Sequence, residues 1–292
     1  MKQTVYISDH LEKATEKGIH YGEAAAKKLQ NIEEIEIILI INNCNNVWCR
    51  DYMPVKSASG KYIHFKYQPS YMFGMVKYKD KFPDRKKLQN EFQLPNYETS
   101  DIILDGGAIE ICGKKGIVSD QVFRDNKSIP EPEIMKEIKD ILDLEQLIVV
   151  PHYPYDFTGH VDGMVRFIDE KSVVVNDLNK ELKCAENSKI PYRIKRIGKW
   201  VADFKSALVS AGLKWVELPT SYSENGSDSS GEGIYINFLL LEDLIIMPGY
   251  GKDEDAEAAD LLKNLYGKKV ITVYATELAK QGGMINCVTW TK

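Results

Sequence analysis

The chain is poor in cysteine for its length, and its cysteines form no recognisable pattern. It has five cysteines in 292 residues, and no two of them are spaced as a Cys-x-x-Cys pair. A disulfide framework uses an even, dense set of cysteines, and a structural zinc site needs closely spaced ligand pairs. The cysteine usage therefore favours a reduced, cytoplasmic protein that holds no metal.

Long apolar runs and an excess of positive charge are also missing. The longest apolar run, Ile37–Ile41, is far shorter than the roughly 18 residues that a membrane span needs, and we expect it to form a buried strand. The first residues contain no apolar segment typical of a secretory signal, which again indicates a cytoplasmic protein. The formal net charge of -5 argues against nucleic acid, because phosphate binding needs a basic surface. We therefore expect neither a membrane nor a nucleic acid as a partner.

What the chain does contain is a repeated strand pattern within an ordinary globular composition. Five segments share one order: a polar or charged residue, an apolar strand, a tight charged turn and a second apolar strand. Turns such as Ser59-Gly60 and Gly113–Gly116 are typical of β-hairpins. The residues that head the segments recur at intervals of roughly 50 to 75 residues, which indicates internal repeats. These residues are Asp51, Asp105, Asp162, Asn237 and Cys287.

Helical periodicity between the hairpins completes the repeat. We expect helices over Pro132–Leu142, Lys195–Ser210 and Asp253–Tyr266, each followed by a strand, at Leu147–Pro151, Lys214–Leu218 and Lys269–Val273. The fifth segment stops at the C-terminus, and the parts that it lacks lie at the N-terminus: strand Thr4–Ser8, a helix near Tyr21–Leu29 and strand Ile35–Ile41. Pairing of the first and last strands would complete it. The sequence predicts one α/β domain over residues 1–292, built as a propeller of five ββαβ units around a pseudo-fivefold axis.

In such a ring the heads of the units converge on the central axis. Three carboxylates, an imidazole and a thiol would then share one cleft: Asp51, Asp105, Asp162, His160 and Cys287. A buried acidic cluster needs a cation, and because no metal-ligand spacing is evident we expect an organic one. A guanidinium is a planar cation with five N–H donors that match carboxylates. A thiolate can attack its central carbon, and an imidazole can move the protons.

Four motifs in this order resemble one known family. They are VWCRDYMP (Val47–Pro54), DGGAIE (Asp105–Glu110), GHVDGMVRF (Gly159–Phe167) and GGMINC (Gly282–Cys287). They are similar to the Trp-x-Arg-Asp-x-x-Pro, Glu-Gly-Gly, Gly-His-Val/Ile-Asp and Gly-Gly-x-Ile-His-Cys motifs of agmatine deiminases and the related bacterial peptidyl-arginine deiminases. The similarity runs from about Trp48 to the end of the chain.

This resemblance implies the pentein fold and a set of roles. Cys287 would be the nucleophile that forms a covalent amidino-thioether, and His160 the general acid and base. Asp51 and Asp162 would hold the guanidinium nitrogens, Asp105 would orient His160, and Trp48 would line the substrate slot. The reaction would convert agmatine and water into N-carbamoylputrescine and ammonia, without a cofactor or metal. The family also forms homo-oligomers, although no interface is evident in this sequence.

Three departures from the family leave the substrate open. The chain is shorter than is usual, Asn286 stands where histidine is common, and Asp105 replaces glutamate. Hydrolysis of peptidyl-arginine and amidino transfer to an amine remain alternatives, as does a pentein that only binds its ligand. The polar loop Ser221–Gly233 is a candidate lid, in which Glu224, Asp228 or Glu232 could meet the terminal ammonium of agmatine.

Overall fold

A computed structural model of the chain describes residues 2–41, 44–72, 74–75, 80–221 and 231–292. Within these ranges the protein has mixed α/β structure. None of the helices described there is both long enough and apolar enough to cross a bilayer.

Five three-stranded sheets make up most of the described β structure. In each sheet the central strand pairs antiparallel with one neighbour and parallel with the other. The first sheet contains β17 (Thr289–Trp290), β1 (Gln3–Ser8) and β4 (Ile35–Ile40), and the second contains β5 (Val55–Lys56), β6 (Tyr62–Lys66) and β7 (Tyr97–Ile103). The others contain β8 (Ile109–Cys112), β9 (Lys115–Ser119) and β10 (Gln146–Val150); β11 (Val165–Asp169), β12 (Ser172–Asn176) and β13 (Lys214–Leu218); and β14 (Leu239–Leu240), β15 (Leu244–Gly249) and β16 (Lys269–Tyr274). A short hairpin joins β2 (Thr15–Glu16) to β3 (Ile19–His20).

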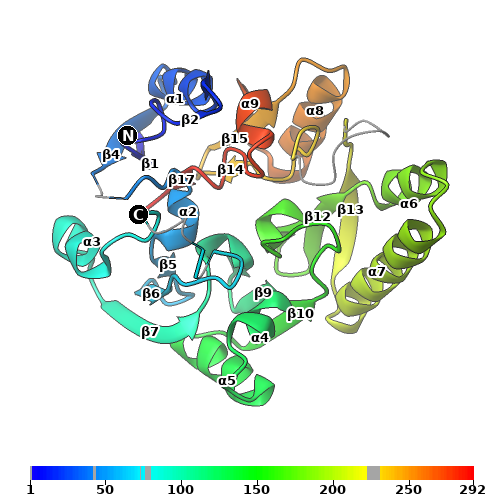
Figure 1. Ribbon diagram of the computed structural model, residues 1–292, viewed down its shortest axis with the longest axis horizontal. Helices are drawn as coiled ribbons and strands as arrows, with labels where there is room; N and C mark the ends of the chain where they lie inside the picture. Colours follow the sequence, from blue (N-terminus) through cyan, green and yellow to red (C-terminus); the bar gives the residue numbers. More distant parts are fainter. Residues whose placement is uncertain (1, 42–43, 73, 76–79, 222–230) are drawn as a thin grey trace.

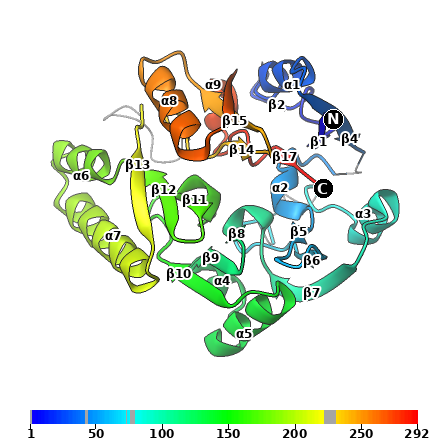
Figure 2. The same cartoon turned by 180° about the vertical axis from the view of Figure 1, so that it is seen from behind.

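Helices connect the second and third strands of the sheets and lie at the periphery of the molecule (Figures 1 and 2). They are α1 (Glu23–Gln30), α3 (Arg85–Phe92), α5 (Glu131–Ile141), α7 (Pro191–Ser210) and α8 (Glu254–Tyr266). The other helices described are α2 (Cys49–Tyr52), α4 (Gln121–Asp125), α6 (Leu178–Asn187) and α9 (Thr276–Ala279). The expected helices and strands are therefore present, with ends that differ by a few residues because capping decides where a helix begins.

The two ends of the chain meet in one sheet, as the sequence predicted. Tyr6 of β1 pairs with Trp290 of β17, and β1 also runs parallel to β4. The N-terminal strands thus complete the segment that ends at the C-terminus. The expected hairpin turns are present as well: Gly60, with φ of +87°, turns the chain between β5 and β6, and Gly113 does so between β8 and β9.

The expectation of a buried strand over Ile37–Ile41 is wrong. β4 is the outer strand of its sheet, and its neighbour β1 covers one edge only. Ile38 and Leu39 are 38% and 46% exposed, and Ile41, beyond the end of the strand, is 59% exposed. A short apolar run fits an outer strand as well as a central one, so periodicity could not separate the two.

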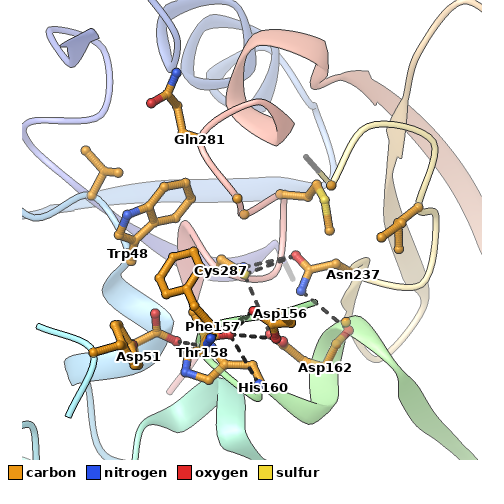
Figure 3. A pocket seen from close by; sticks show the side chains of 18 of the residues that line it. Trp48, Asp51, Asp156, Phe157, Thr158, His160, Asp162, Asn237, Gln281 and Cys287 are labelled. Atoms are coloured by element: carbon orange, nitrogen blue, oxygen red, sulfur yellow. Dashed lines mark hydrogen bonds and ion pairs between the residues drawn. The ribbon is translucent and has the colours of Figure 1, made fainter. Parts of the chain in front are cut away.

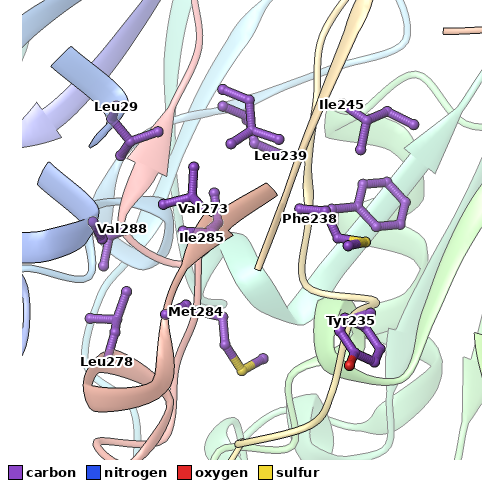
Figure 4. Close-up of a cluster of buried hydrophobic side chains, with 14 of the residues drawn as sticks. Leu29, Tyr235, Phe238, Leu239, Ile245, Val273, Leu278, Met284, Ile285 and Val288 are labelled. Carbon is purple, nitrogen blue, oxygen red and sulfur yellow. The ribbon is translucent and has the colours of Figure 1, made fainter. Parts of the chain in front are cut away.

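A large apolar cluster surrounds the C-terminal segment and fixes its path. Met284, Ile285 and Val288 lie in this cluster together with Leu29 of α1 and Val273 of β16 (Figure 4). Ile285 and Val288 are fully buried, and burying a side chain of this size contributes about 1.5 to 3 kcal/mol. Cys287, which lies between these two buried residues, is therefore held in place by the apolar cluster.

Candidate active site

A cavity of about 660 Å³ brings together the residues that the sequence singled out. Trp48, Asp51, His160, Asp162 and Cys287 all line it, although they come from three separate segments of the chain (Figure 3). Asp51 lies in α2, His160 and Asp162 lie at a 3₁₀ turn before β11, and Cys287 precedes β17. The convergence expected from the repeat pattern is present at these positions.

The imidazole of His160 lies between two carboxylates. Its Nε2 is 2.9 Å from Asp105 Oδ2, and its Nδ1 is 3.5 Å from Asp51 Oδ1. Asp105 is not among the described residues that line the cavity, but its carboxylate contacts the ring nitrogen of His160. The shorter side chain of aspartate therefore still reaches the histidine.

Charge in this buried cluster changes the proton affinity of its members. Burial alone favours the neutral imidazole, but the carboxylates of Asp51, Asp105 and Asp162 outweigh it and raise the pKa of His160 to about 10. Burial and the nearby carboxylates of Asp105 and Asp162 raise the pKa of Asp51 to about 8, although His160 acts in the opposite direction. The pKa of the Cys287 thiol is raised well above 9 by burial and by Asp162 and Asp51. A cluster of residues with shifted pKa values that lies at a cavity is a candidate catalytic site.

Cys287 lies within reach of two polar groups. Its Sγ is 3.8 Å from Asp162 Oδ2 and 3.4 Å from Asn237 Oδ1, as the dashed lines in Figure 3 show. The amides of Asn286 and Cys287 also donate to Asn237 Oδ1, at 3.1 Å and 3.3 Å. Asn237 thus fixes the backbone on which the thiol sits.

Asn286, the departure beside the thiol, takes part in the same network. Its Nδ2 donates to Asp162 Oδ2 at 2.8 Å, so the amide side chain holds one oxygen of this carboxylate. The Asn237 side chain adds a weaker contact, from Nδ2 to the Asp162 backbone carbonyl at 3.4 Å. The orientation of Asp162 is therefore set by neighbours on two segments.

Two glycines leave the space that the site needs. A Cβ atom on Gly107 would lie 2.8 Å from both Asp51 Oδ1 and His160 Nδ1, closer than real Cβ atoms approach. A Cβ atom on Gly283 would collide with the Trp48 ring, which therefore lies close to this backbone. Both belong to Gly-Gly pairs in the motifs, and the close approach gives a physical reason for glycine.

Arg166, which falls inside a motif, serves structure. Its Nε lies 2.5 Å from Glu110 Oε1, its Nη1 donates to the Phe238 carbonyl at 2.5 Å, and its guanidinium stacks on the Phe238 ring. This buried ion pair and the stacking contact indicate a structural role for Arg166. Arg50 Nε approaches the Asn286 carbonyl at 3.4 Å, on the backbone next to Cys287.

Sequence reasoning missed two polar neighbours of the site. Asn237 heads the fourth segment, a position equivalent to the chosen carboxylates, but a neutral amide gave no reason to select it. Tyr71 lies outside every motif and donates its hydroxyl to Asp105 Oδ2 at 2.6 Å. Of the candidate lid acids, Glu224 and Asp228 lie outside the described residues, and Glu232 is not among the described residues that line the cavity.

Comparison with known proteins places the whole chain in one family. The family model for Porphyromonas-type peptidyl-arginine deiminases matches residues 3–292. A putative agmatine deiminase of Streptococcus mutans is 26% identical over 215 residues, which is 67% of this chain and 58% of that protein. The match thus spans a little over half the length of this relative.

Solved structures show a similar fold. The agmatine deiminase of C. jejuni, in a cysteine-to-serine variant with substrate bound, aligns with 100% of this chain and 93% of its own at a TM-score of 0.70 and 19% identity. DDAH from Pseudomonas aeruginosa, a cysteine-to-serine mutant in complex with citrulline, aligns over the full length of both chains at a TM-score of 0.56 and 14% identity. At these identities the likeness establishes the fold.

Proposed function

This chain belongs to the Porphyromonas-type peptidyl-arginine deiminase family, and on that premise we propose that it hydrolyses the guanidinium group of agmatine to N-carbamoylputrescine and ammonia. One observation carries the proposal. A buried thiol and a buried imidazole face one cavity together with the carboxylates of Asp51 and Asp162. A protein that only binds a cation has no use for the thiol and the imidazole, so this set favours catalysis over the binding module.

The charge of the cavity supports a substrate with two positive groups. The described lining residues include five carboxylates and a single lysine, Lys81. The carboxylates are those of Glu16, Asp51, Asp156, Asp162 and Glu181. Agmatine carries a guanidinium and an ammonium, whereas free arginine brings a carboxylate that such a surface repels. The charge of the cavity therefore favours agmatine over free arginine.

Binding of the cation prepares the nucleophile. In the empty site the carboxylates of Asp162 and Asp51 oppose a thiolate at Cys287. A guanidinium held between these carboxylates neutralises their field and places its own positive charge beside the sulfur. The thiol then loses its proton to solvent as the substrate binds. Trp48, which lines the cavity, packs against the substrate.

Two half-reactions follow. The Cys287 thiolate forms a bond to the guanidinium carbon, protonated His160 gives its proton to the leaving nitrogen, and the C–N bond breaks to release ammonia. Neutral His160 then takes a proton from a water molecule whose oxygen bonds to the same carbon. The C–S bond breaks, which returns the thiol, protonated His160 and the ureido product. Asp105 orients His160 in both halves, and no step needs a metal or cofactor.

We also infer that the five sheets are repeats around a pseudo-fivefold axis within one domain of residues 1–292. The shared order of antiparallel and parallel strands in all five supports this arrangement. A homo-oligomeric state and a cytoplasmic location stay predictions of the sequence.

The first experiment compares three substrates. Purified protein is incubated separately with agmatine, free arginine and a short peptide that ends in arginine, and ammonia and ureido product are measured. We expect turnover of agmatine, and a loss of at least about a thousandfold in Cys287→Ala because the covalent route is removed. Faster turnover of the peptide would support the same mechanism but show that peptidyl-arginine, and not agmatine, is the substrate. An added amine that receives the amidino group would indicate transfer in place of hydrolysis.

A covalent probe identifies the nucleophile independently. A haloacetamidine should add one mass increment to the protein, and this increment should persist in Cys112→Ser, since Cys112 is not among the described lining residues. It should disappear in Cys287→Ala. No turnover of any substrate together with no adduct on Cys287 would overturn the hydrolase and leave the binding module.

A further inference from the structure

The hydroxyl of Tyr71 makes a contact that none of the four sequence motifs predicts. It donates to Asp105 Oδ2 at 2.6 Å, and the same oxygen lies 2.9 Å from His160 Nε2. The other oxygen, Oδ1, is buried and has no hydrogen-bond partner among the described residues. The position of this carboxylate is therefore set by two donors that converge on one atom.

The ring of Tyr71 is held by contacts that do not involve its hydroxyl. The ring meets Phe157 edge-on, with centroids 5.4 Å apart, and His160 at 6.2 Å. The amide of the preceding residue, Ser70, donates to Asp125 Oδ1 at 3.1 Å and so ties the loop to α4. Gln121 of the same helix donates to Ser70 Oγ at 3.3 Å. Removal of the hydroxyl alone should thus leave the ring in place.

The groups that face His160 come from every segment packed around it. They are Asp51 of α2, Asp105 and Asp162 at two 3₁₀ turns, and Tyr71. Burial and the charge of Asp105 raise the pKa of Tyr71 well above 10, so its hydroxyl keeps its proton and acts as a donor. Within this set, Tyr71 is the neutral group that donates to Asp105. Its hydrogen bond reduces the negative charge that Asp105 presents to His160.

We propose that Tyr71 is a positioning residue for the deimination: its hydroxyl fixes Asp105 Oδ2 against His160 Nε2 and shares the charge of that carboxylate. This inference rests on the proposed function. It also accounts for aspartate at a position where the resemblance implies glutamate, because a second donor holds the shorter side chain in place. Tyr71 acts through Asp105 and His160, and it makes no bond to the reacting atoms.

Tyr71→Phe tests the hydroxyl while it keeps the ring. We expect kcat for agmatine to fall about tenfold, because one hydrogen bond to a charged group is lost, with KM changed less than about threefold. The basic limb of the pH–rate profile should move upward by about half a pH unit, since an unshared carboxylate holds the proton on His160 more strongly. A role in packing alone would leave kcat and the profile unchanged, and that result would overturn the proposal.

A second tyrosine provides the matched control. Tyr97 lies 2.6 Å from the imidazole of His64 and is not among the described residues that line the cavity, so Tyr97→Phe removes a hydroxyl from a tyrosine–histidine pair elsewhere. We expect its pH–rate profile to match that of the unchanged protein. In an Asp105→Ala background the Tyr71 hydroxyl has lost its acceptor, so adding Tyr71→Phe should cause no further loss of kcat. Losses that multiply would show that Tyr71 acts by another route.

One readout does not depend on activity. The ring signals of His160, assigned from their loss in His160→Asn, can be titrated by NMR in protein labelled at the histidine Cε1 carbons. We expect the pKa of His160 to be higher in Tyr71→Phe than in the unchanged protein, and to be the same in Tyr97→Phe. If the pKa shifts in a protein that deiminates none of the three substrates, the proposed function is refuted, but the effect of Tyr71 on His160 through Asp105 is confirmed. An unshifted pKa would refute the role of Tyr71.

Discussion

Two histidines of this protein are buried to a similar degree and differ in their protonation. His64, on β6, and His160 are 3% and 7% exposed. His64 Nδ1 lies 2.6 Å from the hydroxyl of Tyr97, and His160 reaches the hydroxyl of Tyr71 through Asp105. Burial and the charge of Arg85 lower the pKa of His64 to about 4, whereas the pKa of His160 is raised to about 10.

The comparison separates the effect of burial on the pKa of a histidine from the effect of neighbouring charges. Burial disfavours the charged ring in both places. At His64 the nearby charge is Arg85, which adds to that effect, while at His160 three carboxylates reverse it. A buried histidine thus stays neutral unless acids surround it, and acids surround the one that shares a cavity with a thiol. The other histidine is a packing element that is hydrogen-bonded to the hydroxyl of Tyr97.

Replacement of each histidine in turn should produce the largest difference in kcat between the two sites. His160→Asn removes the proton donor and acceptor, so we expect kcat for agmatine to fall by about a factor of a thousand or more. His64→Asn should keep kcat within about twofold and lower the free energy of unfolding by about 1 to 3 kcal/mol, because a buried polar contact is lost. Ammonia release and urea denaturation measure the two effects. Comparable losses of activity in both variants would remove the distinction between the histidines.

The pH dependence of kcat/KM should report the same acidic cluster, with a smaller effect. Guanidinium binding needs Asp51 in its charged form, and its raised pKa, about 8, means that kcat/KM should fall about tenfold for each pH unit below that value. Departure of ammonia needs a proton on His160, so activity should also fall as the pH rises through about 10. The optimum should therefore be alkaline. Limbs near 4 and 6.5, the ordinary values of aspartate and histidine, would show that burial and charge do not act together here.

The sequence was most informative where chemistry and repetition coincide. Asp51, His160, Asp162 and Cys287 could be identified because charged or reactive residues recur at the heads of similar segments. Their meeting in one cavity follows from the way in which the segments pack. The pairing of β1 with β17 could be predicted because an incomplete segment at one end matched spare strands at the other. In both cases the signal was periodic.

The remainder depended on contacts that leave no periodic signal. Tyr71 lies in a loop between β6 and β7, and only the folded chain brings its hydroxyl to Asp105. Asn237 occupies a predicted position, but its importance comes from three contacts with the backbone and sulfur near Cys287. The opposite protonation of His64 and His160 depends in the same way on which charges lie within a few ångströms. Sequence spacing could locate segments, but it could not determine these distances.

The smallest expected effect concerns the pKa of His64, the neutral histidine of the pair. Arg85→Met removes the cation near His64 and leaves the ring buried. Since burial is the larger cause of the low pKa, we expect the pKa of His64 to rise by less than about one pH unit and to stay below 6.5. NMR titration of the labelled histidine ring measures this, with His160 in the same sample as an internal reference that should not move. A rise beyond 6.5 would mean that Arg85 keeps His64 neutral, and that charge decides the protonation of both histidines.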